Sequence, residues 1–248
     1  MEKILILTDY TPTCYDSVTY GLDFCRYYGF GAEILHIEEE DEDINVHERM
    51  RVMELASLYR GKMQGRVDVV TRGGDFSSVI SEMSDSGGYT LIVMGTHGRS
   101  GFQSLTGSAA ARVITSQDLP VIVVQSKRFS PVRVALLPVA DSVGQYSGEI
   151  EKMAAITRMM GADVRLVCRR GEEYHAGEIS DLFGRVLPVD LSVDYCKDRT
   201  FSLQAIEHGE KIGADMFLGF SHEISRPTFA PTLEQLMFNL ALIPVMCC

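Results

Sequence analysis

Glycines are concentrated in one short segment, residues 95–108, which directly follows the apolar run 91–94. The segment contains four glycines and ends in a serine: Gly95, Gly98, Gly101, Gly107 and Ser108. Glycines let the backbone approach a ligand closely and adopt conformations that other residues avoid. A helix beginning at 107–108 would offer unpaired N–H groups and a positive dipole end, which suit a phosphate. The segment therefore predicts a phosphate-binding loop. The alternative is a plain turn in which Ser108 only caps a helix.

Other reactive arrangements do not stand out in the sequence. The loop is not followed by Gly-Lys-Ser/Thr, and no Gly-x-Gly-x-x-Gly follows the first apolar run. The six histidines show no metal-ligand spacing with cysteines or carboxylates. No Ser-His-Asp order with a nucleophile elbow is found. We therefore expect neither a metal site nor a catalytic triad.

The composition is that of a folded, acidic protein. Of 248 residues, 46% are hydrophobic and 23% are charged, and the formal net charge is −11. Non-specific nucleic-acid binding needs an excess of Lys and Arg, so no nucleic-acid partner is expected. No apolar run reaches the ~18–20 residues of a membrane span. The first residues do not resemble a signal peptide. We expect a cytoplasmic protein without membrane association, whose cysteines are reduced thiols.

The sequence carries an internal repeat. Four pairs of segments match in the same order: 3–7 with 133–137, 31–37 with 161–167, 91–95 with 215–219, and 119–122 with 243–246. The offset falls from 130 in the first two pairs to 124 in the last two, so the second copy is slightly shorter. Residues 126–131 lie between the copies and are predicted to be a linker. The repeat predicts two domains, 1–126 and 132–248.

Each copy alternates short apolar runs with helical patterns. In the first copy five runs predict buried strands: 4–7, 34–37, 67–70, 91–94 and 121–124. Helices are predicted through Val18, Leu22 and Cys25, then over 45–59, 76–83 and 107–116. Met50, Met53, Ala56 and Leu58 are predicted on the inner side of the second helix. Because parallel strands need crossover connections, the fold class is α/β: two tandem five-stranded parallel-sheet α/β sandwiches, Rossmann-like.

These features resemble the universal stress protein family, whose fold is an α/β sandwich of the adenine-nucleotide-alpha-hydrolase-like type. Its nucleotide-binding members carry a Gly-x2-Gly-x9-Gly-Ser/Thr loop. Here Gly95-x-x-Gly98 is followed by Gly107-Ser108, with eight residues between Gly98 and Gly107 in place of nine. The opening residues 3–9 and the strand end Leu35-His-Ile37 also resemble the family. The resemblance covers nearly all of 1–126 and continues more weakly through 132–248, so the chain resembles a tandem member.

The resemblance implies roles for the residues at matching positions. Asp9 would accept hydrogen bonds from the ribose hydroxyls, Ile37 and Met94 would sandwich the adenine, and Gly95 would let the ribose approach. Four residues would offer backbone N–H groups to the phosphates: Gly98, Gly107, Ser108 and Ala109. A helix-capping role for Asp9 and plain core roles for Ile37 and Met94 remain as alternatives.

The second copy lacks the residues that would bind phosphate. Three loop positions change: Gly98 to His222, Gly101 to Ser225 and Gly107 to Pro231. Proline has no N–H to give a phosphate. Val139 stands where the first copy has Asp9. We therefore expect a degenerate second domain that does not bind nucleotide in the same way.

The fifth strand of each copy, 121–124 and 245–248, is apolar and would lie at a sheet edge, where exposed strands invite pairing. In the family, two domains associate through this strand. The resemblance thus implies an intramolecular pseudo-dimer of the two copies, with a homodimer of the chain as a further option.

Three hypotheses for the function follow. The first is a stress-response protein whose first domain binds ATP or a related adenine nucleotide, with or without Mg²⁺, and which acts on an unknown protein partner as a nucleotide-dependent regulator. No general base is evident, so at most slow ATP hydrolysis is expected. The second is an interaction or scaffold module of the same fold that binds no nucleotide. The third, an adenylate-transferring enzyme, lacks recognisable catalytic residues.

The assignment of the glycine loop can be tested by the substitution Gly107→Asp. The new carboxylate would place negative charge and bulk at the predicted phosphate position, so we expect weaker ATP binding by isothermal titration calorimetry. An unchanged ATP affinity would show that the loop is wrongly assigned.

Overall fold

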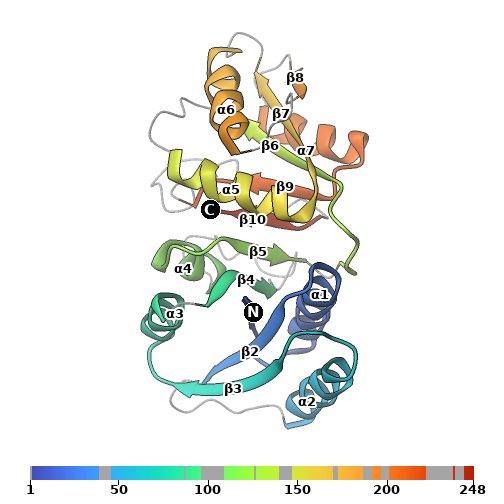
Figure 1. The fold of residues 1–248 in the computed structure, drawn as a ribbon, viewed down its shortest axis with the longest axis vertical. Helices are drawn as coiled ribbons and strands as arrows, with labels where there is room; N and C mark the ends of the chain where they lie inside the picture. Colours follow the sequence, from blue (N-terminus) through green and yellow to red (C-terminus); the bar gives the residue numbers. More distant parts are fainter. Residues whose placement is uncertain are drawn as a thin grey trace. The chain divides into compact units, whose positions relative to one another are not determined.

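The chain folds into two units, Met1–Phe129 and Ser130–Cys248 (Figure 1). The computed structural model describes residues 2–38, 46–86, 88–95, 109–125, 127–139, 147–169, 173–186, 192–196, 201–221, 237 and 243–248. Each unit is an α/β sandwich around a parallel sheet of five strands, which confirms the predicted fold class.

The first unit alternates strands and helices throughout. Its strands are β1 (Lys3–Leu7), β2 (Gly31–Glu38), β3 (Val67–Gly73), β4 (Tyr89–Gly95) and β5 (Val121–Val124). Its helices are α1 (Pro12–Tyr28), α2 (Val46–Arg60), α3 (Phe76–Asp85) and α4 (Ala109–Ser116). Every strand predicted in the first copy is present. The central strands are buried because helices cover both faces of the sheet.

The strand order of the first unit is β3-β2-β1-β4-β5, and all neighbouring strands are parallel. The chain runs outward from β1 to β3, then returns to β4 on the other side of β1. Right-handed crossovers therefore place α1 and α2 on one face and α3 and α4 on the other, as Figure 1 shows. The order reverses between β1 and β4, and ligands of such sheets bind outside the carboxyl ends of the strands at this switch point.

Helix α1 lies close to the strands beneath it. Val18, Leu22 and Cys25 are fully buried, as their spacing predicts. Gly21 faces Ile6 of β1, and a Cβ atom at Gly21 would lie 2.8 Å from the Ile6 Cδ1 atom. The small residue at this point lets the helix axis approach β1.

The predicted inner face of α2 is wrong. The residues that α2 buries are Val52, Leu55, Ala56 and Tyr59. Three of the four residues predicted on the inner side are exposed instead: Met50 by 57%, Met53 by 46% and Leu58 by 53%. Apolar residues occur on both sides of this helix, so the 3.6-residue period alone did not decide which side packs on the sheet.

The second unit repeats the architecture. Its strands are β6 (Val134–Val139), β7 (Asp163–Arg169), β8 (Ser192–Cys196), β9 (Met216–Gly219) and β10 (Val245–Cys247). Its described helices are α5 (Ser147–Met160), α6 (Glu173–Val186) and α7 (Phe201–Ile212). The strand order is β10-β9-β6-β7-β8, which corresponds strand by strand to that of the first unit. The internal repeat is therefore a repeat of topology as well as of sequence.

A glycine contact fixes the connection into β3. A Cβ atom added to Gly65 would lie 2.6 Å from the Cα and N atoms of Gly31 and from the carbonyl oxygen of Phe30. These are backbone atoms of the segment that opens β2, so they cannot move aside as a flexible side chain could. By contrast, a Cβ atom at Gly61 would have no neighbour closer than the Leu58 carbonyl oxygen at 4.0 Å.

We expect Gly65→Ala to lower the free energy of unfolding by about 1–3 kcal/mol, because the added methyl group forces the backbone of β2 and β3 apart. Gly61→Ala is the matched control and should leave stability unchanged or slightly raised. Urea denaturation of the full chain measures both. Equal stabilities of the two variants would contradict the close approach at Gly65.

Candidate functional site

The switch point of the first unit is formed by the turn after β1 and by the end of β4. The two strands are neighbours, with Ile6 opposite Val93, so their carboxyl ends lie together. Asp9 follows β1 and Gly95 ends β4. The structure therefore brings together two of the residues predicted for the site.

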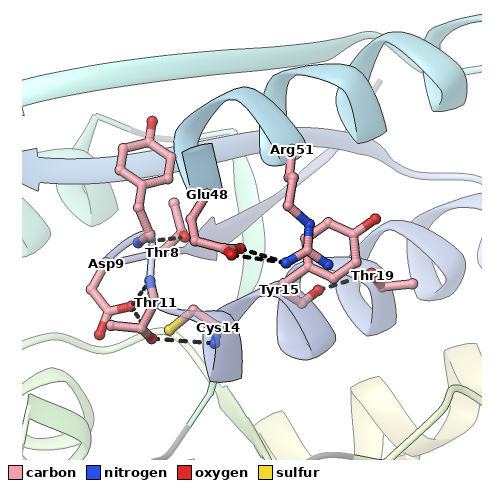
Figure 2. A network of polar contacts seen from close by, with 9 residues as sticks. Thr8, Asp9, Thr11, Cys14, Tyr15, Thr19, Glu48 and Arg51 are labelled. Atoms are coloured by element: carbon pink, nitrogen blue, oxygen red, sulfur yellow. Dashed lines mark hydrogen bonds and ion pairs between the residues drawn. The ribbon is translucent and has the colours of Figure 1, made fainter. Parts of the chain in front are cut away.

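Asp9 belongs to a tight hydrogen-bonded turn (Figure 2). Its Oδ1 atom accepts hydrogen bonds from the Thr11 N–H at 2.9 Å and from the Thr11 hydroxyl at 2.7 Å. Thr11 is also the N-cap of α1, and its hydroxyl oxygen accepts from the Cys14 N–H. The cap of α1 is thus Thr11, and Asp9 orients that cap. Asp9 itself is exposed.

Tyr10 occupies a left-handed conformation in this turn, with φ of 54°, which is unusual for a residue other than glycine. Its N–H donates to the Thr8 hydroxyl oxygen at 3.2 Å. Its ring is buried against His36 of β2, with 4.4 Å between ring centroids. The His36 Nδ1 atom lies 3.0 Å from the Thr8 carbonyl oxygen. These contacts fasten the turn after β1 to the neighbouring strand β2.

Sequence reasoning missed Tyr10, Thr11 and His36 as parts of the site. A signal for Thr11 was available, because a threonine directly before a proline is typical of the start of a helix. The positions of Tyr10 and His36 depend on the pairing of β1 with β2, which a motif does not show.

The two residues expected to flank adenine are largely buried. Ile37, near the end of β2, is 8% exposed, and Met94, near the end of β4, is 5% exposed. Both lie one residue before the last residue of their strands. This placement is compatible with a ligand role and with a plain core role.

Gly95 is required by the packing of α1. A Cβ atom at Gly95 would lie 2.7 Å from the Oγ atom and 3.0 Å from the Cβ atom of Ser17. A glycine here lets α1 approach the end of β4. The packing of α1 is therefore a structural reason for a glycine at this position, separate from the predicted ribose contact. The role of Gly95 towards a ligand stays a prediction.

The other predicted phosphate contacts lie mostly outside the described residues. Gly98, Gly107 and Ser108 fall in the segment 96–108, which the structure does not describe. Ala109 is described as the first residue of α4. The described residues stop at Gly95, the end of β4, and resume at Ala109, so the roles of the predicted phosphate contacts stay predictions.

A second group of contacts joins α2 to α1 (Figure 2). The Arg51 Nη1 atom donates to both carboxylate oxygens of Glu48, at 2.9 and 2.8 Å. The Arg51 guanidinium carbon lies 4.3 Å from the centre of the Tyr15 ring, a cation–π distance. This stack holds the start of α2 against the first turns of α1.

Cys14 lies beneath the Asp9 turn as a neutral thiol. Burial, together with the negative charge of Asp9, raises the pKa of the Cys14 thiol to about 12. The side chain is 8% exposed. Since the thiolate is the reactive form, Cys14 is not a nucleophile at neutral pH.

A family model described as the universal stress protein family matches residues 1–125, half of the chain. The chain belongs to the universal stress protein family. This membership confirms the resemblance that was carried by the glycine segment and the opening strand. No curated protein sequence matches the chain.

Solved structures share the fold of this universal stress protein over both units. One is a universal stress protein from Archaeoglobus fulgidus, with 16% identity, a TM-score of 0.69 and coverage of 99% of this chain and 97% of that one. Another is a putative universal stress protein from Pseudomonas aeruginosa, with 14% identity, a TM-score of 0.58 and coverage of 100% and 92%. The cytoplasmic domain of a prokaryotic cation chloride cotransporter also matches, with 8% identity, a TM-score of 0.55 and coverage of 99% and 94%. Within the described ranges, no helix is long and apolar enough to cross a membrane.

The effect of the Asp9 charge on the pKa of the Cys14 thiol can be tested by Asp9→Asn. This substitution keeps a side-chain oxygen that accepts hydrogen bonds from Thr11 and removes the charge. Because the charge raises the pKa of Cys14, the variant should form more thiolate and react severalfold faster with iodoacetamide at pH 8.5. Cys25 is the internal control, since burial raises its pKa and Asp9 does not contribute. Mass spectrometry of the two cysteine peptides measures both rates. A Cys14 reaction rate equal to that of the wild-type protein would contradict an effect of the Asp9 charge on the Cys14 thiol.

Proposed function

We propose that the first unit binds ATP or a related adenine nucleotide at the switch point between β1 and β4, and that the protein acts in the cytoplasm as a nucleotide-dependent regulator of the stress response. The observation that carries the proposal is the Asp9 turn. An exposed carboxylate is held by Thr11 at the carboxyl end of β1, beside the end of β4, in a chain of the universal stress protein family. This is the place in an open α/β sheet where ligands bind.

The Asp9 carboxylate is suited to the ribose. A carboxylate offers about four acceptor sites, so it can accept from a ribose hydroxyl in addition to its two hydrogen bonds from Thr11. The turn is held by backbone and side-chain contacts at both ends, which keeps the carboxylate in place before a ligand arrives. The apolar side chains of Ile37 and Met94, at the ends of β2 and β4, would flank the adenine.

The phosphates would lie against the glycine loop and the start of α4. The N–H groups of Gly98, Gly107, Ser108 and Ala109 are the proposed donors, with the helix dipole favouring negative charge. Mg²⁺ would accompany the nucleotide as part of the ligand. We assign no chemical step to the protein, and at most slow hydrolysis of the nucleotide is expected.

The regulatory effect would come from occupancy. A ligand that binds one arrangement of the segment 96–108 better than others increases the population of that arrangement. The surface that this segment presents to a protein partner would then depend on whether nucleotide is bound.

A second candidate function is an interaction module that binds no nucleotide. The exposed apolar residues of α2 favour it: Val46 is 64% exposed, Met50 57% and Met53 46%, and they follow one another at helical spacing. The fold does not decide between the two functions, because the same fold occurs in the domain of a cotransporter. Mass spectrometry of the protein denatured after purification separates them: a retained adenine nucleotide supports the first, and its absence after incubation with ATP supports the second.

The nucleotide site is tested by Asp9→Ala. Loss of a hydrogen bond to a charged group costs about 1.5–3 kcal/mol, so ATP affinity should fall about 10- to 150-fold. Asp16→Ala is the matched control, because Asp16 is an exposed aspartate of the same helix-start region and should leave affinity unchanged. Isothermal titration calorimetry measures both variants. Equal affinities for Asp9→Ala and the wild-type protein would falsify the assignment of Asp9.

A further inference from the structure

The sheet of the first unit ends at β3. Within the described residues β3 pairs with β2 alone, and no strand continues the sheet beyond it (Figure 1). The strand has seven residues, and its last three, Thr71, Arg72 and Gly73, are exposed. A Cβ atom added to Gly73 would have no neighbour within 4 Å apart from the adjacent residues. The carboxyl half of β3 is therefore uncrowded, and an exposed strand edge invites pairing with another strand.

The backbone of β3 presents every second residue to its outer edge. The Ala32 N–H of β2 donates to the Arg66 carbonyl oxygen at 2.8 Å, so the backbone of Arg66 faces β2. Because N–H and C=O groups alternate in direction along a strand, the odd-numbered residues of β3 face outward. These residues are Val67, Val69, Thr71 and Gly73. The Arg60 Nε atom donates to the outward carbonyl oxygen of Val67 at 2.8 Å, which agrees with this alternation.

Two opposite charges leave the same face of β3. Asp68 and Arg72 are both even-numbered residues of the strand, and side chains at even positions share one face. The Asp68 Oδ1 atom accepts a hydrogen bond from the Arg66 Nε atom at 3.0 Å. A carboxylate has about four acceptor sites, so Asp68 can accept from a second guanidinium as well. The strand therefore carries a negative charge near its start and a positive charge near its end.

A second copy of β3, added antiparallel, would bring these opposite charges together. Residues that lie opposite each other in an antiparallel pair must both face the shared edge or both face away from it. With a twofold axis at Val70, Asp68 of each copy lies opposite Arg72 of the other copy. Val69 then lies opposite Thr71, and these two outward-facing residues form the hydrogen-bonded pairs. The Asp68–Arg72 pairs are non-hydrogen-bonded pairs, in which the side chains lie closer together.

The neighbouring registers lack this match. A twofold axis at Val69 would place Arg66 opposite Arg72, so two like charges would face each other. An axis at Thr71 would leave Asp68 and Arg72 opposite uncharged residues. Opposite charges stabilise a cross-strand pair and like charges destabilise it. Charge therefore favours the register with the axis at Val70.

We propose that the outer edge of β3 is a homodimer contact, at which a second copy of this chain adds its own β3 with the twofold axis at Val70. Two Asp68–Arg72 ion pairs flank the axis. This edge is the one opposite to β5, the strand through which the family resemblance implies pairing. The contact does not depend on nucleotide binding. One pair of strands is a small contact area, so the dimer is weak and its population rises with protein concentration.

Charge reversal tests the ion pairs. Arg72→Asp would place a new carboxylate opposite Asp68, so the dimer dissociation constant should rise at least about tenfold in analytical ultracentrifugation. Combining Arg72→Asp with Asp68→Arg restores opposite charges and should restore the dimer. Arg185→Asp, at an exposed position of α6, is the control and should leave the constant unchanged.

Three results of the charge reversal would overturn the proposal. The first is a wild-type chain that stays monomeric up to about 0.5 mM, because even a weak strand contact should be populated there. The second is a dimer that Arg72→Asp leaves intact, and the third is a double variant that stays as weak as Arg72→Asp alone.

Cysteine substitution tests the register. Val70→Cys would place a thiol on the twofold axis opposite its own copy, at a Cα–Cα distance of about 4.5 Å that a disulfide can span. Mild oxidation should then link two chains on a non-reducing gel, with the wild-type chain and its six cysteines as background. Val69→Cys is the matched control and should not link, because Thr71 lies opposite it. A link through Val69→Cys, or no link through Val70→Cys, would contradict the proposed contact.

Discussion

The close packing of α1 on the sheet is the constraint on which the candidate site depends. Ser17 of α1 lies so near Gly95 that a Cβ atom there would be 2.7 Å from the serine oxygen, and Gly21 lies equally near Ile6. The helix can start only where this packing places its first turn. Thr11, the cap of that turn, is therefore fixed relative to the ends of β1 and β4, and Thr11 in turn holds Asp9.

The turn after β1 also contains backbone strain, and the surrounding contacts maintain it. A non-glycine residue in the left-handed region costs of the order of 1–3 kcal/mol. Tyr10 adopts that conformation while its ring is buried on His36, and burial of a large aromatic side chain stabilises by a comparable amount. The strained backbone turns the chain so that Asp9 is exposed while its neighbour Tyr10 is in the core.

The sequence was sufficient for the strands because a strand covered on both faces needs an unbroken run of Val, Ile and Leu, and such runs stand out. It was not sufficient for α2, where Val52 and Ala56 lie on one side and Met50 and Met53 on the other, so the period fits either side. At the site, Asp9 and Gly95 could be named from the family resemblance. Tyr10 and His36 could not, since their contact arises only when β1 pairs with β2.

The duplicated topology gives each unit a switch point with its own side chains. A sheet with a switch point always presents strand ends and a helix start at the same place, so each unit must satisfy the unpaired N–H groups of that helix. In the first unit the cap is a neutral threonine hydroxyl, and α1 has no acidic residue in its first turn. In the second unit Glu149 stands in the first turn of α5 and bonds to the segment after β9. The described starts of the two helices therefore differ in charge, with a threonine hydroxyl at the cap of α1 and a carboxylate in the first turn of α5.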